Sequence, residues 1–326
     1  MNVPSVGSRL LVAVAIASAA ALMPLIASTT VGVDNDFGVF WFAARALLQG
    51  RDPYTLIGPG FEYEEVLPFR YPITSAIAAI PFAGFQEVPA TIVFVWVSTC
   101  LLAYALTAEG WSRLPVFLSV PFIIALQQAQ WSPLLTAAAC LPALAWIVTV
   151  KPNIGLAILA GDQSGRVLKV AALGGGALAL IGLLFVPTWP VEWFASLQGP
   201  GSLGAPLFRP WGWVAILALL RWRRPEARLL FILACVPQTP AWYEALPLFL
   251  VAVTLRETLF LAVVSSAPVA FEMLFGRGDG FLRMYPNGLE LMLFAYLPAI
   301  IITIRRPNQG ALPDWIPGVF RLFRPR

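Results

Sequence analysis

The sequence predicts an all-α polytopic membrane protein, and three observations support this fold class. Apolar residues make up 59% of the 326 residues. Charged residues make up only 12%, and the mean hydropathy is +0.79, whereas soluble domains carry about 25% charged residues. Apolar runs recur along the whole chain, as they do in helical membrane proteins. We therefore expect a single integral membrane domain over residues 1–326 with about 10–12 transmembrane helices.

The apolar runs define twelve predicted spans, with both chain ends on the cytoplasmic side. Most of the 21 Lys and Arg residues then lie on that side, in agreement with the positive-inside rule. Several runs are shorter than the roughly 20 residues that a bilayer requires, so we expect short or re-entrant helices there. The predicted spans are Leu10–Val31, Pro72–Gln86, Pro89–Thr107, Leu114–Gln127, Trp131–Thr149, Asn153–Gly161, Lys169–Pro187, Pro210–Leu220, Leu229–Gln238, Trp242–Leu255, Thr258–Phe275 and Tyr285–Ile304.

Two long outer loops and a basic cytoplasmic tail complete this topology. The loops cover residues 32–71 and 188–209, and the tail covers 305–326. The first loop holds about a third of the chain's carboxylates, which points to chemistry or binding there. These acidic residues are Asp34, Asp36, Asp52, Glu62, Glu64 and Glu65.

The segment after Asp36 predicts an interfacial helix that ends near Gly50. Its apolar residues repeat at helical spacing, which favours a helix lying in the membrane interface plane, and Gly50 suits its C-terminal end. Asp36 is then either the N-cap of this helix or a functional carboxylate, and Asp34 is the adjacent alternative. The predicted apolar face consists of Phe37, Phe40, Trp41, Ala44 and Leu48.

Lys151 is one of only two lysines, and it lies between two apolar runs. A cation at membrane depth is costly and indicates function, although snorkelling to the interface is the alternative. Arg70 before the second span has the same two interpretations: it contacts lipid headgroups, or it holds a phosphate.

Two further polar interruptions are candidates for binding. Gln127, Gln128 and Gln130 lie close together at one predicted span end, where they line a polar cavity or are simply hydrated. The segment Gln238–Glu244 interrupts another apolar run with a proline, aromatic rings and a carboxylate.

The chain has no histidine and only three cysteines, all within predicted spans. The commonest general base and the commonest transition-metal ligand are therefore missing. We expect no cofactor and no metal site, except that a divalent ion held by Asp34 and Asp36 remains open. Acid–base chemistry must then use carboxylates, Tyr or Lys.

Four blocks together resemble the polyprenyl-phosphate-mannose-dependent mannosyltransferases of glycosyltransferase family 87, within the GT-C superfamily. The family pattern often has His where this chain has Tyr243-Glu244, and Gly-Gln where it has Ala129-Gln130. The four blocks are Asp36–Tyr54 with Tyr71-Pro72, the segment around Gln130, Lys151-Pro152 and Pro240–Pro247.

The resemblance implies a membrane glycosyltransferase with a GT-C-type fold and an active site on the outer face of a bacterial cytoplasmic membrane. A sugar, mannose by the resemblance, moves from a polyprenyl phosphate to a lipid or glycan acceptor, with inversion. Asp36 is the expected general base, with Asp34 beside it, and Lys151 and Arg70 bind the donor phosphate. The remaining substrate-binding candidates are Tyr71, Gln130, Asn153, Trp242, Tyr243 and Glu244.

Two alternatives from other classes stay open. The same groove suits a transporter or flippase of a lipid-linked substrate, for which charged pairs at mid-membrane and broken helices would be the signs. A non-catalytic subunit of a membrane complex is the other. The predicted partners of the glycosyltransferase are a polyprenyl-phosphate-linked sugar, a lipid or glycan acceptor and membrane lipids, and no nucleic-acid footprint is present.

Overall fold

The computed structural model describes residues 4–30, 35–65, 67–198, 204–275 and 286–310. The fold is 73% helix, and these ranges contain no strand. Four helices are long and apolar enough to cross a membrane, consistent with the predicted class of helical membrane protein. They are Val6–Ile26, Glu87–Leu106, Gly165–Phe185 and Leu255–Phe275. The other apolar segments form shorter helices, so the figure of 10–12 spans stays a prediction.

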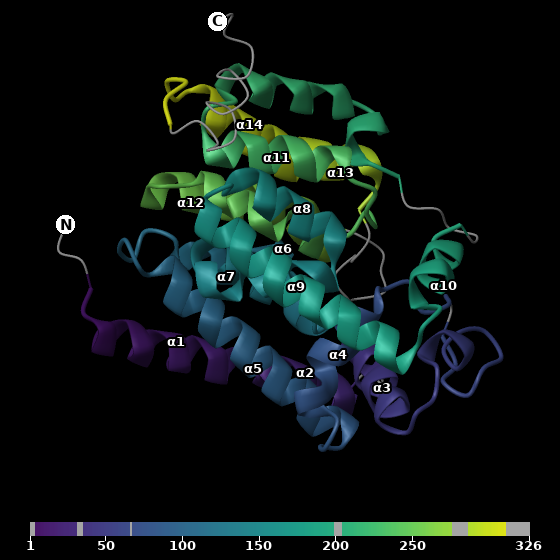
Figure 1. Ribbon diagram of the computed structural model, residues 1–326. Coiled ribbons are helices and arrows are strands. Elements are labelled where there is room, and N and C mark those ends of the chain that lie inside the picture. Colours follow the sequence, from purple (N-terminus) through teal and green to yellow (C-terminus); the bar gives the residue numbers. More distant parts are fainter. Residues whose placement is uncertain (1–3, 31–34, 66, 199–203, 276–285, 311–326) are drawn as a thin grey trace, which may run out of the picture.

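Many of the helices follow one another closely, whereas residues 49–72 form a long connection whose only helical segment, among the described residues, is Pro53–Thr55 (Figure 1). The α-helices are α1 Val6–Ala20, α2 Leu22–Thr30, α3 Asp36–Leu48, α4 Ile73–Ala79, α5 Glu87–Leu106, α6 Val120–Gln127, α7 Ser132–Cys140, α8 Pro152–Gly161, α9 Gly165–Phe185, α10 Trp189–Ser196, α11 Pro225–Cys235, α12 Leu255–Phe275, α13 Gly288–Leu291 and α14 Leu297–Ile304. The 3-10 segments are η1 Pro53–Thr55, η2 Ile80–Phe82, η3 Leu114–Leu118, η4 Pro142–Val150, η5 Pro206–Phe208, η6 Gly212–Arg221 and η7 Trp242–Val251, and η8 Met292–Tyr296 is a π segment.

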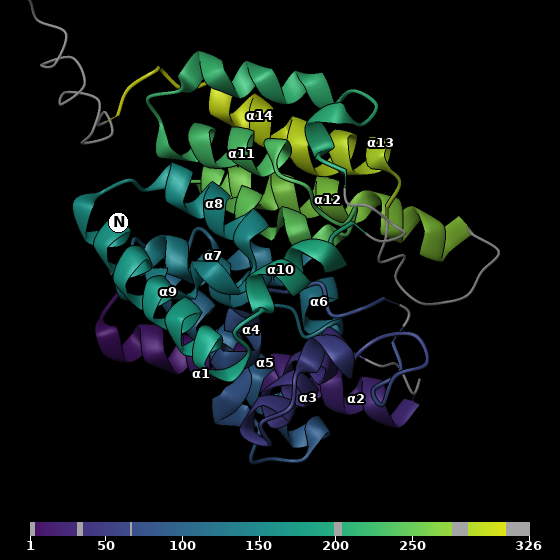
Figure 2. The same cartoon turned by 45° about the vertical axis from the view of Figure 1, so that its right-hand side comes forward.

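Proline sets many of these boundaries. It occupies the first or second position of α6, α7, α8 and α11, where its missing N–H and fixed φ cost nothing. Proline therefore more often begins a new short helix within an apolar run than it kinks a continuing helix. Figures 1 and 2 show α6, α7 and α8 in the middle of the molecule, between α1 with α5 on one side and α11 with α14 on the other.

The predicted span Trp131–Thr149 does not cross the molecule. The Lys151 ammonium donates to the Gln130 side-chain oxygen over 3.0 Å, so the chain returns to its starting level after 21 residues. Between these two points α7 and η4 run as a hairpin, because the Leu141–Pro142 step ends the α-helix.

The predicted span Pro72–Gln86 also returns to the side on which it began. The Trp41 indole N–H on α3 donates to the Phe85 carbonyl over 3.0 Å. A Cβ placed on Gly38 would lie 2.3 Å from the Glu87 carboxylate. The start of α5 therefore lies beside α3, and α4 with η2 does not traverse the bundle.

Because neither of these two segments crosses the molecule, the predicted assignment of inner and outer sides is reversed for the chain between residues 72 and 130. Ser112 and Arg113, predicted on the outer side, donate to the Val253 and Ala252 carbonyls over 3.0 Å each. Those carbonyls follow η7, at the end of the molecule where the arginines gather. We call this the basic end, and the opposite end the site end. The basic end contains Arg9, Arg113, Arg221, Arg223, Arg224, Arg228 and Arg306.

The site end of α8 lies about halfway along α5. Both α5 and α8 reach one cavity at the basic end, which Ala105 and Gly161 line. From there the 20 residues of α5 extend about 30 Å, whereas the 10 residues of α8 extend about 15 Å. Lys151, which precedes α8, is therefore near the mid-depth of the longest central helix.

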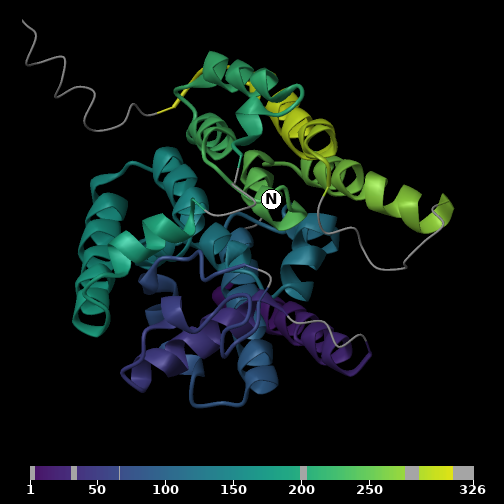
Figure 3. The ribbon, with the colours of Figure 1, turned by 90° about the vertical axis from the view of Figure 1, so that its right-hand side faces the viewer.

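Three of the four long helices are peripheral. Only 22% of the Val6–Ile26 and α9 spans and 28% of the α12 span are buried, against 50% of α5. Figure 3 shows α9 and α12 on opposite flanks. Their outward side chains are large and apolar, with Leu184 84% exposed and Leu274 75% exposed. Such surfaces suit contact with lipid.

Helix α3 is packed inside the protein more deeply than an interfacial helix. Phe37, Phe40 and Ala44 of the predicted apolar face are buried, but Leu48 is 58% exposed and Leu47 is buried in its place. The helix ends as predicted, with Gly50 at φ +69°. Leu47 and Ala46 carbonyls accept the Gly50 and Arg51 N–H groups, over 2.9 Å each, which is a Schellman ending.

Candidate functional site

Asn35, and not Asp36, caps α3. The Asn35 side-chain oxygen accepts the N–H groups of Phe37 and Gly38, over 3.1 and 3.3 Å. Asp36 is the first helical residue. The N-cap interpretation of Asp36 is therefore wrong, and its carboxylate is available for other contacts.

The Asp36 carboxylate is joined to Lys151 through one amide. The Gln130 side-chain N–H donates to Asp36 Oδ2, and the Gln130 oxygen accepts from the Lys151 ammonium over 3.0 Å. Gln130 and Lys151 are buried, whereas Asp36 is half-buried. The carboxylate thus lies at the outer edge of a connected polar group.

Lys151 also forms a buried ion pair with Glu244. Its ammonium lies 2.8 Å from Glu244 Oε1, and the two side chains are 7% and 1% exposed. The Asn153 amide donates to Glu244 Oε2 over 3.3 Å. The Tyr243 ring centroid lies 4.6 Å from the ammonium and that of Tyr71 lies 6.0 Å away, so the aromatic faces add cation–π attraction. We call Asp36, Gln130, Lys151, Asn153 and Glu244 the charge network.

The ends of broken helices position the charge network. Asp36 begins α3, Lys151 and Asn153 flank the first residue of α8, and Glu244 is in the first turn of η7. Gln130 lies between α6 and α7. These side chains therefore come from four separate segments of the chain, and their positions depend on how the short helices pack.

The turn that presents Gln130 has an unusual backbone. Ala129 has φ +44°, a conformation that costs an L-residue roughly 1–2 kcal/mol. The Ala129 and Gln130 N–H groups donate to the Leu126 and Ala125 carbonyls, over 3.0 and 2.9 Å. This is the same Schellman ending as that of α3, with alanine where Gly50 stands.

Burial raises the pKa of Asp36 from 3.8 to about 6. The attraction of Lys151 and the hydrogen bond from Gln130 oppose this rise, while the negative charges of Glu65 and Glu244 add to it. A carboxylate with a pKa near 6 is ionised at neutral pH and still accepts a proton more readily than an ordinary aspartate.

The other predicted site residues are placed less centrally. The Tyr71 carbonyl accepts from the Tyr54 hydroxyl over 2.8 Å, and the Arg70 carbonyl accepts from the Trp193 indole over 3.2 Å. Trp242 belongs to the buried apolar core. Asp34 lies outside the described residues, so its role and an ion shared with Asp36 stay predictions.

Sequence reasoning missed the contact that fixes α3 against α5. A Cβ on Gly38 would meet Glu87 Oε1 at 2.3 Å and the Tyr63 hydroxyl at 2.5 Å. The hydroxyl in turn donates to the Glu87 carboxylate over 3.3 Å. A glycine inside a predicted helix indicates that another segment approaches its backbone closely. Gly38 is the sequence signal from which this contact could have been predicted.

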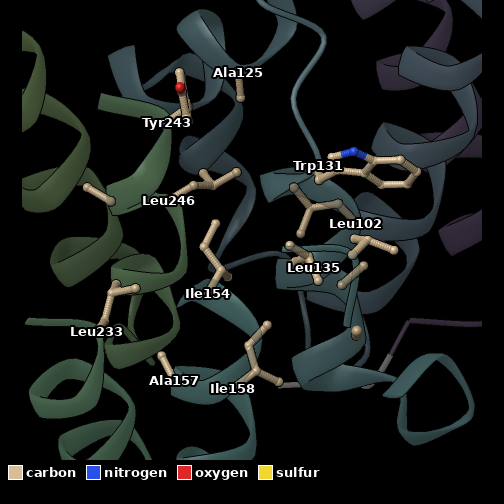
Figure 4. Packing of buried hydrophobic residues seen from close by; sticks show 14 of the residues in the cluster. Leu102, Ala125, Trp131, Leu135, Ile154, Ala157, Ile158, Leu233, Tyr243 and Leu246 are labelled. Atoms are coloured by element: carbon tan, nitrogen blue, oxygen red, sulfur yellow. The ribbon is translucent and has the colours of Figure 1, made fainter. Parts of the chain in front are cut away.

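A cavity of about 510 Å³ lies at the basic end, and none of its lining residues belongs to the charge network. An apolar layer separates the two. Figure 4 shows Leu246 and Ile154 in this layer. Above them lies Tyr243, beside the charge network, and below them lies Ile158, which lines the cavity.

No protein-family model, curated protein or solved structure matches this chain. Among the described residues, no three His, Cys, Asp or Glu side chains gather as a metal site would require. The charge network itself is therefore the feature from which a function is inferred.

Proposed function

We propose that this protein is a membrane glycosyltransferase of the GT-C type, which moves a sugar from a polyprenyl phosphate to a hydroxyl acceptor. The observation that carries the proposal is the Asp36–Gln130–Lys151 connection, a half-buried carboxylate held beside a buried ammonium. The resemblance to the polyprenyl-phosphate-mannose-dependent family supports mannose as the sugar. It also supports a bacterial cytoplasmic membrane and a site that opens to the outer face.

In this reaction Asp36 is the general base. The acceptor hydroxyl oxygen attacks the anomeric carbon, its proton passes to the Asp36 carboxylate, and the bond from that carbon to the phosphate oxygen breaks. The configuration is inverted because there is one displacement. The polyprenyl phosphate leaves with the electron pair, and Lys151 stabilises its charge. Arg70 is the second proposed phosphate ligand.

The half-buried position of Asp36 fits this role. A base must be reached by the acceptor while remaining in a setting that raises its basicity. The pKa of about 6 for Asp36 supplies the second condition. Tyr71, Tyr243, Asn153 and Trp242 are the proposed substrate contacts.

The test is sugar transfer by purified protein in lipid nanodiscs with radiolabelled polyprenyl-phosphate-mannose and a membrane lipid extract as acceptor. Asp36→Asn should lower the rate by roughly 10²–10⁴, the usual contribution of a general base. The matched control is Asp52→Asn. Asp52 caps η1 by accepting the Tyr54 N–H over 2.9 Å, and asparagine caps equally well. Full activity of Asp36→Asn would reject the assignment.

A transporter of a lipid-linked anion is the second candidate, and one observation favours it. The Lys151–Glu244 pair is buried near the mid-depth of α5, where broken helices begin. Buried charges at mid-depth and discontinuous helices also occur in transporters. Movement of a fluorescent polyprenyl phosphate across liposomes containing the protein, without consumption of the sugar donor, would favour transport.

A further inference from the structure

We propose that the Glu244 carboxylate occupies the place of an oxyanion ligand, and that the phosphate of the lipid-linked substrate displaces it from Lys151. This inference rests on the proposed function. It gives Glu244 a role of its own: it is a built-in substitute for the substrate phosphate and sets how tightly that phosphate is bound.

The Glu244 carboxylate is held in the way that a bound oxyanion would be. One oxygen lies 2.8 Å from the Lys151 ammonium and the other accepts from the Asn153 amide over 3.3 Å. An ammonium and an amide N–H at the start of a helix form a typical receptor for a phosphate or carboxylate oxygen. The structure therefore contains a formed oxyanion site, with a carboxylate of the protein in it.

The charges around Lys151 leave no place for a second anion beside Glu244. Around Lys151 there is one ammonium and two carboxylates, those of Asp36 and Glu244. Glu65 adds further negative charge beside Asp36. A phosphate placed next to Lys151 while Glu244 stayed would put three anions around this ammonium in a buried setting. The proposed contact with Arg70 would offset only part of that charge, so the arrangement is strongly unfavourable. A phosphate therefore enters only when Glu244 leaves.

Two of the three Lys151 N–H donors already have acceptors, and the carboxylate in direct contact with the ammonium is that of Glu244. The ammonium also lies over the Tyr243 ring. Asp36 reaches Lys151 through Gln130, so it can stay in place as the base while Glu244 is exchanged.

The experiment measures binding of undecaprenyl monophosphate to the purified protein in nanodiscs, with the phosphate lipid titrated against uncharged lipid. Glu244→Gln keeps the side-chain shape and removes the competing charge, so it should bind the phosphate at least tenfold more tightly than the wild type. Lys151→Gln should lose binding. The matched control is Glu62→Gln, a surface carboxylate paired with Arg51, which should bind as the wild type does.

An affinity of folded Glu244→Gln equal to or weaker than that of the wild type would overturn the displacement. If folded Lys151→Gln still loses binding in that case, the proposed phosphate site is supported and only the displacement of Glu244 is rejected. If Lys151→Gln binds as the wild type does, the phosphate site fails as well. The role of Asp36 is tested separately, by transfer.

Two further arms complete the design. Glu244→Asp keeps the charge but shortens the side chain by one methylene, and it covers the case in which Glu244→Gln does not fold. It should bind the phosphate severalfold more tightly than the wild type, and unchanged affinity would overturn the inference. Inorganic phosphate should bind far more weakly than the lipid, and equal affinity would overturn the lipid-linked assignment.

Discussion

At the basic end, most arginine side chains donate to backbone carbonyls, and Arg224 and Arg306 also pair with carboxylates. At the site end, Lys151 donates to two side chains. Arg228 donates to the Ala160 and Gly161 carbonyls over 2.9 and 3.0 Å. Arg221 donates to the Ile304 carbonyl over 2.8 Å. These carbonyls lie at the C-terminal ends of α8 and α14, where the helix has no partners for them and its dipole is negative.

The difference teaches how to separate structural from functional charge in a membrane protein. An arginine on a helix end satisfies groups that are always present, so its contacts are permanent. Lys151 instead holds an amide and a carboxylate that can move away. The first arrangement fixes the fold and its orientation, and the second is suited to exchanging a ligand.

The largest expected effect is loss of Lys151. Lys151→Met leaves Glu244 buried without its cation, which should cost about 3–5 kcal/mol of stability. The double variant Lys151→Met with Glu244→Met removes both charges and should recover most of this loss. Chemical unfolding in detergent measures both. A double variant no more stable than the single one would show that the pair is not an isolated charge unit.

The next effect concerns the contact that positions Lys151. A Cβ on Gly155 of α8 would lie 2.1 Å from the Val148 carbonyl oxygen of η4. Gly155→Ala should therefore push α8 away from η4 and cost on the order of 1–3 kcal/mol. Gly176→Ala on α9 meets nothing within 4 Å and should stabilise by about 0.5–1 kcal/mol. Similar melting temperatures for the two variants would contradict this packing.

A smaller effect is the pH dependence of stability at Asp36. Because the pKa is raised from 3.8 to about 6 in the folded protein, ionisation disfavours folding, and stability is lost as pH rises through this window. Asp36→Asn should raise the melting temperature at pH 8 and give little gain at pH 4. A gain that is equal at both pH values would show that the burial of Asp36 does not raise its pKa.

The smallest effect compares two equivalent turns. Ala129→Gly relieves the positive φ of a non-glycine residue and should stabilise by about 0.5 kcal/mol, after the entropy of the unfolded glycine is subtracted. Gly50→Ala at the matching position of α3 should destabilise by about 1 kcal/mol. Thermal unfolding of both variants measures this backbone strain. If Ala129→Gly is less stable than the wild type, the positive φ of Ala129 is not a source of strain.

The sequence alone pointed to the members of the charge network. Asp36, Gln130, Lys151 and Glu244 are polar residues at the edges of long apolar runs, where a charged group requires a partner or a function. The structure joins all four. Sequence could not show that Lys151 pairs with Glu244, because 93 residues and several helices separate them, and only the packed fold sets their distance.

The orientation between residues 72 and 130 could not be predicted, for two physical reasons. An apolar run of 15 to 19 residues is compatible with one crossing or with two short returning helices. Charge did not decide between them, since the 108–113 connection carries one acid, Glu109, and one base, Arg113. The contacts of Arg113 with Ala252 and of Trp41 with Phe85 decide it.

The halfway position of Lys151 along α5 has an electrical consequence. Moving one elementary charge across the whole membrane against a potential of 100 mV changes its free energy by about 2.3 kcal/mol. If α5 spans the whole membrane, an anion that reaches Lys151 from the site end crosses about half of that field, and its binding free energy should shift by roughly 1 kcal/mol per 100 mV. In energised vesicles, occupancy of this lysine would then respond to voltage.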